Sequence, residues 1–292
     1  MAIDVEQDPS GPSEWSSAPR IWRSGPDQLR PADVFLWRAA RGPRRGSAPL
    51  VYVPGLGPHS TNRTRWERFV QRVEMIPLRL DREVWIVGRL TALGAGTTMA
   101  SLAADHARAI RSRFDGPVDV LGESTGGSIA LQLALDHPEV VKRLFLVSAA
   151  VAMRGSGRAA QREVGRSLRA GAPRRAAGIM LAHTTRRPLQ RRLLTAAGFL
   201  LGRVVIGAND HDLIAEIEAE DRLDLRSRID QLSVPTVLIG GSDDGYYSPE
   251  LFAETTEHVD GAEYVALPDK GHMTVTTDRT VAREIRERLR EE

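Results

Sequence analysis

The sequence predicts an α/β fold built on a mostly parallel sheet flanked by helices on both faces. Short apolar runs alternate with helical stretches along most of the chain, and this alternation is typical of parallel sheets. The stretch Gly122-Glu123-Ser124-Thr125-Gly126 lies where one apolar run meets a helix, and Gly271-His272 follows the last run. Reactive groups in such sheets gather at the carboxyl ends of the strands, so both motifs are expected at one edge.

The predicted strands are short and rich in β-branched or aromatic residues, as buried strands are. They cover residues 20–23, 34–38, 50–53, 83–87, 118–121, 143–148, 235–240 and 263–267. Helices are predicted at 99–114, after Ser124 as far as Asp136, and at 278–292. Pro138 ends the second helix, because the residue before a proline is disfavoured in the α region. The third has an amphipathic pattern.

The composition is that of an ordinary globular protein. Of the 292 residues, 41% are hydrophobic and 27% are charged, which suits one large domain with an insertion. The chain has no cysteine, which excludes disulfides, thiolate chemistry and cysteine-ligated metals. This is compatible with a reducing cytoplasm, the location that we expect. A formal net charge of +2 gives no indication of nucleic-acid binding.

Neither a secretory signal nor a membrane span is predicted. Residues 1–19 are acidic, rich in proline and serine, and lack an apolar core, so we expect a flexible leader there. The longest apolar tract, at 193–208, is interrupted by Arg203 and is too short to cross a bilayer.

Ser124 is the candidate nucleophile. The pattern G-x-S-x-G is weak alone in a chain with 26 glycines, but here an apolar strand precedes it and a helix follows. A sharp strand-to-helix turn exposes the hydroxyl at its apex, and Gly122 and Gly126 avoid collisions with the neighbouring strand and helix. The plain alternative is a glycine-rich turn in which Ser124 caps the helix.

A nucleophilic serine needs a histidine to accept its proton and a carboxylate to orient that histidine. Of the seven histidines, His272 has the most suitable position, in the loop between the last strand and the last helix. Asp243 and Asp244 directly follow the strand at 235–240, and either is a candidate for the carboxylate. Adjacent aspartates in a turn are also common turn formers.

The order of these residues resembles the α/β-hydrolase superfamily, in which nucleophile, acid and histidine follow one another along the chain. The resemblance covers about 20–150 and 231–292. The family's frequent G-x-x-D spacing aligns Gly241 with Asp244, which implies the acid role for Asp244 and leaves Asp243 as second choice.

The resemblance also implies an oxyanion hole. The turn Pro54-Gly55-Leu56-Gly57 is similar to the family's loop after the third strand, with a proline in place of the usual histidine. Leu56 and Thr125 would then donate their backbone N–H groups to the developing negative charge. The family's serine members hydrolyse acyl compounds without a metal or organic cofactor. The expected substrate is a small or medium apolar acyl compound, most simply a carboxylic ester.

Residues 151–230 lie where this family inserts a cap, and their composition predicts helices. The expected organisation is therefore a leader at 1–19, a core at 20–150 and 231–292, and a cap between. The segment 154–203 has 12 arginines against one acid, whereas 204–230 has eight acids and three arginines. The apolar tract at 193–206 is expected to form the underside of the cap, facing the site.

Four arginines in this segment recur every fourth residue and share one helix face. This arginine stripe, expected to be solvated, consists of Arg154, Arg158, Arg162 and Arg166. The alternative is a stripe that binds an anionic substrate, a lipid surface or nucleic acid.

Two other functions remain as alternatives. One is a catalytically silent binding protein that holds a ligand under the cap; an intact set of serine, aspartate and histidine favours the enzyme instead. The other is an aminopeptidase, in which Glu216, Glu218 or Glu220 of the cap would bind the substrate amine. The sequence makes no prediction of the oligomeric state.

Overall fold

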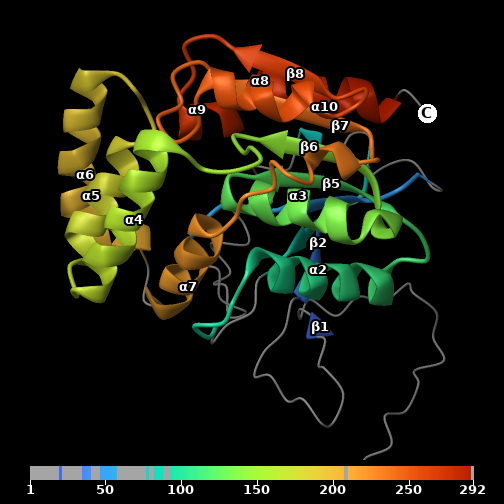
Figure 1. The fold of residues 1–292 in the computed structure, drawn as a ribbon, viewed down its shortest axis with the longest axis horizontal. Helices are drawn as coiled ribbons and strands as arrows, with labels where there is room; N and C mark the ends of the chain where they lie inside the picture. Colours follow the sequence, from blue (N-terminus) through green and yellow to red (C-terminus); the bar gives the residue numbers. More distant parts are fainter. Residues whose placement is uncertain are drawn as a thin grey trace, which may run out of the picture.

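The computed structural model describes residues 20–21, 35–40, 47–57, 77–78, 82–88, 93–206 and 210–290. Their strands form one eight-stranded sheet in the order β1-β2-β4-β3-β5-β6-β7-β8 (Figure 1). Strands β3 to β8 pair in parallel, and β1 and β2 are antiparallel, so the predicted mostly parallel sheet is confirmed. The strands are β1 (Arg20–Ile21), β2 (Phe35–Ala40), β3 (Leu50–Val53), β4 (Val84–Val87), β5 (Val118–Glu123), β6 (Val141–Val147), β7 (Thr236–Gly241) and β8 (Glu263–Leu267).

The strand boundaries lie within a few residues of those predicted. β2 continues to Ala40 instead of ending at 38, because a bulge lets Ala40 pair with Val84 of β4. β6 begins at Val141, two residues early, directly after the 3-10 helix η2 (Pro138–Val140). The leader expected at 1–19 and the second half of the first predicted strand lie outside the described residues.

Two hydrophobic clusters cover the two faces of the sheet. Along β5, Val120 packs with α2 and α3 on one face, while the next residue, Leu121, packs with α10 on the other. This alternation follows from the two-residue period of a strand. Among the described residues, the α-helices outside the insertion are α2 (Met99–Arg113), α3 (Thr125–Asp136), α8 (Pro249–Glu257), α9 (His272–Thr276) and α10 (Arg279–Arg290).

A buried ionic cluster ties the sheet to the C-terminal helix. The Asp119 carboxylate on β5 is fully buried and lies 2.8 Å from Arg143 Nε and 3.5 Å from Arg82 Nε. Both arginines also donate to carbonyls in the last turn of α10, Arg143 to Arg288 at 2.6 Å and Arg82 to Leu289. Cations at the C-terminal end of a helix satisfy carbonyls that lack a partner within the helix.

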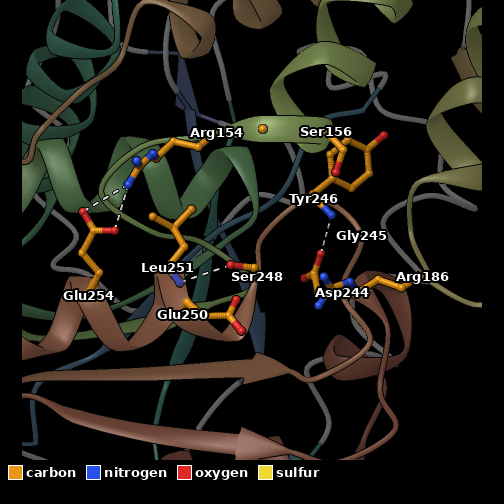
Figure 2. A pocket seen from close by; sticks show the side chains of 11 residues that line it. Arg154, Ser156, Arg186, Asp244, Gly245, Tyr246, Ser248, Glu250, Leu251 and Glu254 are labelled. Atoms are coloured by element: carbon orange, nitrogen blue, oxygen red, sulfur yellow. Dashed lines mark hydrogen bonds and ion pairs between the residues drawn. The ribbon is translucent and has the colours of Figure 1, made fainter.

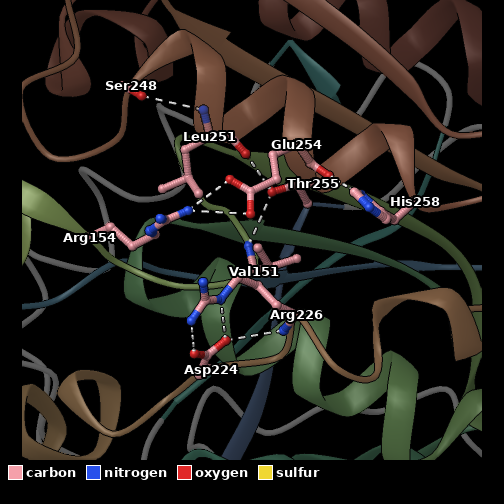
Figure 3. Close-up of polar contacts among 9 residues, drawn as sticks. All are labelled: Val151, Arg154, Asp224, Arg226, Ser248, Leu251, Glu254, Thr255 and His258. Carbon is pink, nitrogen blue, oxygen red and sulfur yellow. Dashed lines mark hydrogen bonds and ion pairs between the residues drawn. The ribbon is translucent and has the colours of Figure 1, made fainter.

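A helical insertion separates β6 from β7. It contains α4 (Gly155–Arg169), α5 (Pro173–Ala182), α6 (Pro188–Ile206), α7 (Asp210–Asp221) and η3 (Ile229–Gln231). Its two ends meet, because Ala152 bridges Asp224 and Leu225 N donates to Val151 O at 3.0 Å. Figure 3 shows Val151 at this junction, bonded to Thr255 of α8.

The arginine stripe lies on α4 and is solvent-exposed, as expected, but its members have acidic partners. Arg158 and Arg162 lie 2.8 and 2.6 Å from Asp221 at the end of α7. Arg154 reaches Glu254 of α8 at 3.0 Å (Figure 3), and Arg166 reaches Glu163 at 2.7 Å. Ion pairs between Asp221 and two arginines of the stripe therefore join α4 to α7.

The expectation for the apolar tract at 193–206 is wrong. The tract forms most of α6, which packs against α5 through Gly198 and Gly202. The contacts at these two glycines lie on the side of α6 that faces α5, and most of the large apolar side chains of the tract lie elsewhere on the helix and are exposed to solvent. The apolar cluster beside the core comes mainly from α4, α5 and α7, and α6 adds only its last residue, Ile206. None of the described helices is long and apolar enough to cross a bilayer.

Candidate active site

Ser124 stands at the join of β5 and α3, at the carboxyl edge of the sheet. Its backbone has φ 50° and ψ −125°, a conformation that L-residues rarely adopt. Its N–H donates to Val147 O of β6 at 2.9 Å, which fixes the turn to the neighbouring strand. Strain of this kind persists only where the surroundings over-determine it, and it holds the hydroxyl at the apex of the turn.

The glycines around Ser124 are required by close packing. A Cβ on Gly122 would lie 2.6 Å from Ala130 Cβ, so α3 could not pack back on β5. A Cβ on Gly126 would lie 2.1 Å from Val53 O, so the loop after β3 could not approach the turn. The sequence motif thus reflects the contact between β3, β5 and α3 that presents the serine.

His272 reaches Ser124 from the beginning of α9. Its Nε2 lies 2.8 Å from Ser124 Oγ, and its Nδ1 lies 2.8 Å from Asp244 Oδ2. The ring is 7% exposed. The backbone N–H of His272 donates to Thr184 O at 2.7 Å, so the loop between α5 and α6 helps to hold the histidine in place.

The two aspartates after β7 have different environments. Asp244 is buried, and its Oδ1 accepts from Tyr246 N at 2.8 Å and Tyr247 N at 3.1 Å, which leaves Oδ2 directed at His272. Asp243 instead accepts from Thr185 Oγ1 at 2.5 Å and lies 3.3 Å from Arg187 Nε. Asp243, the second choice for the acid, therefore binds the insertion and does not contact the histidine.

Negative charge surrounds the imidazole. Burial by itself lowers the pKa of His272, because it disfavours the charged ring. The charge of Asp244, its hydrogen bond, and the charges of Glu123 and Glu220 outweigh burial, and the pKa of His272 lies above its ordinary value. Tyr247 stacks on the ring at 6.1 Å between centroids, and Tyr246 lies at 5.0 Å.

The two expected oxyanion donors belong to segments that adjoin Ser124. Thr125 is the first residue of α3, so its N–H precedes the helical hydrogen-bond ladder. Leu56 follows Gly55, where a Cβ would be 3.3 Å from Ser124 Cβ, so this loop passes directly over the serine. Among the described residues no cluster of histidines and carboxylates could hold a metal ion.

Several site residues were not predicted as such. Glu123 contacts Tyr52 Oη on β3 and accepts from Thr276 Oγ1 on α9 at 2.8 Å, so it connects the turn to these two elements. Glu220 bonds to residues of α3, and Tyr246 and Tyr247 pack on His272. No sequence pattern predicts that Glu220 contacts Thr125 and Ser128, which lie 95 and 92 positions earlier in the chain. The two tyrosines closely follow the candidate aspartates, so their position in the sequence could have indicated that they lie near the site.

A polar cavity of about 220 Å³ lies beside the acid (Figure 2). Arg154 and Arg186 bring positive charge to it, and Glu250 and Glu254 bring negative charge. Its lining includes the loop from Asp244 to Tyr246 but neither Ser124 nor His272, so an acyl group there would not meet the serine.

Comparisons with known proteins agree with this fold. A pimeloyl-[acyl-carrier protein] methyl ester esterase from Neisseria meningitidis is 27% identical over 175 residues, 57% of this chain and 66% of that protein. This chain thus spans just under two thirds of the length of that relative. A pyrrolizixenacetamide deacetylase from Xenorhabdus hominickii is 25% identical over 239 residues, 78% of this chain and 85% of that protein.

The likeness extends to solved structures and to a whole family. A hydrolase from Pseudomonas aeruginosa superposes with a TM-score of 0.72 at 18% identity, covering 94% of this chain and 99% of that one, which shows a shared fold. The model of the alpha/beta hydrolase fold matches residues 49–278, well over half of the chain. The chain therefore belongs to the alpha/beta hydrolase fold family, as its sequence motifs predicted.

Proposed function

We propose that this chain is a serine hydrolase that cleaves carboxylic esters of small or medium apolar acyl groups. The observation that carries the proposal is the continuous hydrogen-bond chain from Asp244 through His272 to Ser124. Each member has the environment that its role needs: a buried, oriented carboxylate, an imidazole with raised pKa, and a hydroxyl at the apex of a strained turn.

Acylation begins when Ser124 Oγ attacks the ester carbonyl carbon while His272 Nε2 takes the hydroxyl proton. The carbonyl oxygen becomes an oxyanion, which the N–H groups of Leu56 and Thr125 stabilise. Asp244 holds the imidazole in the tautomer with Nε2 free and stabilises the imidazolium. Collapse of the intermediate breaks the C–O bond of the ester, and His272 returns the proton to the departing alcohol.

Deacylation repeats these steps with water. His272 takes a proton from the water as its oxygen attacks the acyl carbon, and a second oxyanion forms in the same hole. Collapse breaks the bond to Ser124, whose oxygen recovers the proton from His272. One ester and one water yield one carboxylic acid and one alcohol, and the enzyme is regenerated.

The preference for apolar acyl groups rests on the insertion, which we assign as a cap over residues 151–230. Leu56 packs against the apolar cluster of the insertion, as do Ile179 and Met180 of α5 and Ile214 of α7, so this cluster borders the oxyanion loop. An apolar border excludes water and strengthens the hydrogen bonds to the oxyanion. A methyl ester is the substrate named for the Neisseria relative, and its small alcohol would fit this arrangement.

The contacts of the cap carboxylates argue against an aminopeptidase. Glu220 is 1% exposed and already accepts several hydrogen bonds, and Glu218 pairs with Arg169. Glu216 is buried as well. A substrate amine would have to displace these partners.

Active-site labelling tests the proposal and the silent-binder alternative together. A fluorophosphonate should add its mass to the peptide that carries Ser124, and Ser124→Ala should abolish both labelling and ester turnover. A series of p-nitrophenyl esters of increasing chain length would then define the acyl preference. Labelling at another residue, or full turnover by Ser124→Ala, would contradict the proposal, whereas a protein that is inert towards both reagents would be a binding protein.

A further inference from the structure

Glu220 is a buried carboxylate that the reaction steps above do not use. It lies in the last turn of α7 and is 1% exposed. One oxygen accepts from Thr125 Oγ1 at 2.8 Å and Gln161 Nε2 at 2.5 Å, and the other from Ser128 Oγ at 2.6 Å and Tyr247 Oη at 3.3 Å. The donors come from α3, α4 and the loop that carries Asp244, so this one side chain joins three parts of the molecule.

Burying the Glu220 carboxylate between α7 and α3 has an unfavourable desolvation free energy. Removing an ionised group from water is strongly unfavourable unless hydrogen bonds compensate, and all four of these donors are neutral groups. If the contact served only to hold the insertion on the core, apolar side chains of similar size would do so at lower cost. The charge therefore calls for a reason beyond packing.

The donors of Glu220 lie next to the reacting groups. Thr125 and Ser128 form the first turn of α3, and the Thr125 N–H is one of the two proposed oxyanion donors. Tyr247 stacks on His272 with 17° between the ring planes, and its N–H donates to Asp244 Oδ1. Burial and the charge of Glu220 raise the pKa of Tyr247 well above its ordinary value, so the hydroxyl remains a donor.

We propose that Glu220 is a positioning residue of the hydrolase, whose carboxylate fixes the Thr125 N–H towards the oxyanion and holds Tyr247 against the His272 ring. This inference rests on the proposed function. Because oxyanion donors must be aligned before the charge develops, a residue that locks the first turn of α3 acts mainly on the transition state. Its negative charge also favours the imidazolium that forms as Ser124 loses its proton.

The variant Glu220→Gln keeps the size of the side chain and removes the charge. We expect kcat to fall about tenfold to a hundredfold, somewhat less than the loss of a whole oxyanion donor, with KM nearly unchanged. The acid limb of the kcat/KM profile should move to lower pH, because His272 loses a neighbouring negative charge. A purely structural role would not move this limb. Glu218→Gln, two residues earlier on α7 at a carboxylate that is 29% exposed and pairs with Arg169, is the matched control.

Two further variants keep the test decisive if Glu220→Gln is unstable. Thr125→Val retains the backbone N–H but removes the hydroxyl that Glu220 binds, and Tyr247→Phe retains the ring but removes its donor. Both should lower kcat more than KM. If folded Glu220→Gln and both of these variants keep the wild-type kcat and pH profile while Ser124→Ala is inactive, the positioning role is refuted. If Ser124→Ala is active, the proposed function itself fails.

A separate observation concerns the surface of α6. Six large apolar side chains on this helix are between 52% and 79% exposed, namely Leu189, Leu193, Phe199, Leu200, Leu201 and Val204. Leu189, Leu193, Leu200 and Val204 recur at spacings of four and seven, so they share one side of the helix. Contiguous exposed apolar surface of this kind marks an interaction site.

The positive charge near the exposed apolar side of α6 indicates which kind of partner it binds. From 164 to 209 the chain has nine arginines and no acidic residue; of these, Arg191 and Arg192 lie in the first turns of α6, whereas Arg187 pairs with Asp243 and Asp269. A second copy of the chain would bring the same arginines against one another. The face is also the side of a single helix at the edge of the molecule (Figure 1), which suits a flat surface better than a groove.

We propose that α6 binds the interface of an anionic lipid bilayer, with its apolar side among the acyl chains and its arginines at the headgroups. Arg192 is exposed on the same side of α6 as Leu189 and Leu193, and a helix whose exposed apolar residues are flanked by basic ones lies in this way in the plane of a membrane. Each basic residue near an anionic surface adds to the attraction, which salt weakens. This surface is separate from Ser124, so lipid binding does not depend on the proposed reaction.

Sedimentation with vesicles tests this surface, using Ser124→Ala protein so that lipid hydrolysis cannot interfere. The protein should sediment with vesicles of phosphatidylglycerol and phosphatidylcholine in equal parts, and much less with phosphatidylcholine alone or in high salt. Leu193→Gln with Leu200→Gln should weaken binding at least about tenfold, since each buried leucine contributes strongly. Arg192→Gln should also weaken it, whereas Arg283→Gln on α10 should not.

Three results would overturn the lipid proposal. The first is absence of sedimentation with the anionic vesicles, as expected if the surface binds an acidic protein. The second is equal binding by the double leucine variant. The third is a dimer in light scattering that Leu200→Gln dissociates, because α6 would then be covered by a second copy.

Discussion

At the scale of single residues, one turn decides which of two adjacent aspartates contacts the histidine. Tyr246 N and Tyr247 N both donate to Asp244, and these bonds direct its second oxygen to His272. Asp243 points the other way, to Thr185 and Arg187. The environment, and not the residue type, therefore distinguishes the two carboxylates.

This difference predicts unequal effects of the same substitution. Asp244→Asn should reduce kcat by about 10⁴-fold, because the imidazole would lose its orienting acceptor and adopt the wrong tautomer. Asp243→Asn removes only an interaction with the insertion and should change kcat by far less. Steady-state kinetics on one p-nitrophenyl ester compare them, and a reversed ranking would place the acid at Asp243.

The charges around His272 predict the pH dependence of activity. The reaction needs the neutral imidazole, and the pKa of His272 is raised, so the acid limb of kcat/KM should lie above the value of about 6.5 of an ordinary histidine. Glu123→Gln removes one of the charges that raise this pKa and should shift the limb downwards. An acid limb at or below the ordinary value would contradict the charge argument.

The raised pKa of His272 also makes the free energy of unfolding depend on pH. A folded-state pKa above the unfolded value means that the folded protein binds the proton more tightly. The resulting contribution to stability is present below the unfolded pKa and disappears as the pH rises through the folded pKa. Protonated His272 thus stabilises the fold at the acidic pH at which it cannot act as a base.

At the scale of elements, the insertion presents different helices to the core and to solvent. Ile179 and Met180 of α5 and Ile214 of α7 pack against the same apolar cluster as Leu56 of the oxyanion loop. We expect Met180→Ala with Ile214→Ala to lower kcat/KM mainly for longer p-nitrophenyl esters, because these esters lose the most apolar contact. Leu200→Ala on the exposed side of α6 should leave the chain-length profile unchanged. A change of preference in Leu200→Ala alone would show that α6 reaches the acyl group.

The arginine stripe on α4 predicts little effect on a neutral substrate. The side chains of Arg158 and Arg162 are 41% and 52% exposed, and both pair with Asp221. Exchanging both for glutamine should leave kcat and KM for a neutral ester nearly unchanged, since exposed ion pairs contribute little. A large loss of activity with this ester would mean that the stripe contributes to the site.

At the scale of the whole molecule, the ionic cluster at Asp119 connects β5, β6 and the C-terminal helix. Asp119→Asn would leave Arg82 and Arg143 with less compensation in a buried place. Removing one member of such a pair costs about 3–5 kcal/mol, which urea unfolding would measure. Glu139→Gln, which breaks an exposed pair with Arg111, is the control and should hardly move the midpoint. An equal loss in both variants would contradict the role of burial.

The sequence by itself determined the sheet, the order of its elements and the identities of Ser124, Asp244 and His272 as candidates. Strand and helix periods are local, and a nucleophile turn needs glycines within two residues of the serine, so both leave a readable pattern. The observed strands follow the predicted runs, with β8 at Glu263–Leu267 as expected.

Only the tertiary structure decided which way the insertion faces and what supports the site. The apolar tract of α6 was expected to face the site. The expectation failed because the hydrophobicity of a segment does not determine which part of the molecule packs against it. Close contacts at Gly198 and Gly202 turned it outwards. Glu220 meets Thr125 and Ser128 across more than 90 residues of sequence, a contact that no local pattern encodes, since it depends on how α7 packs on α3.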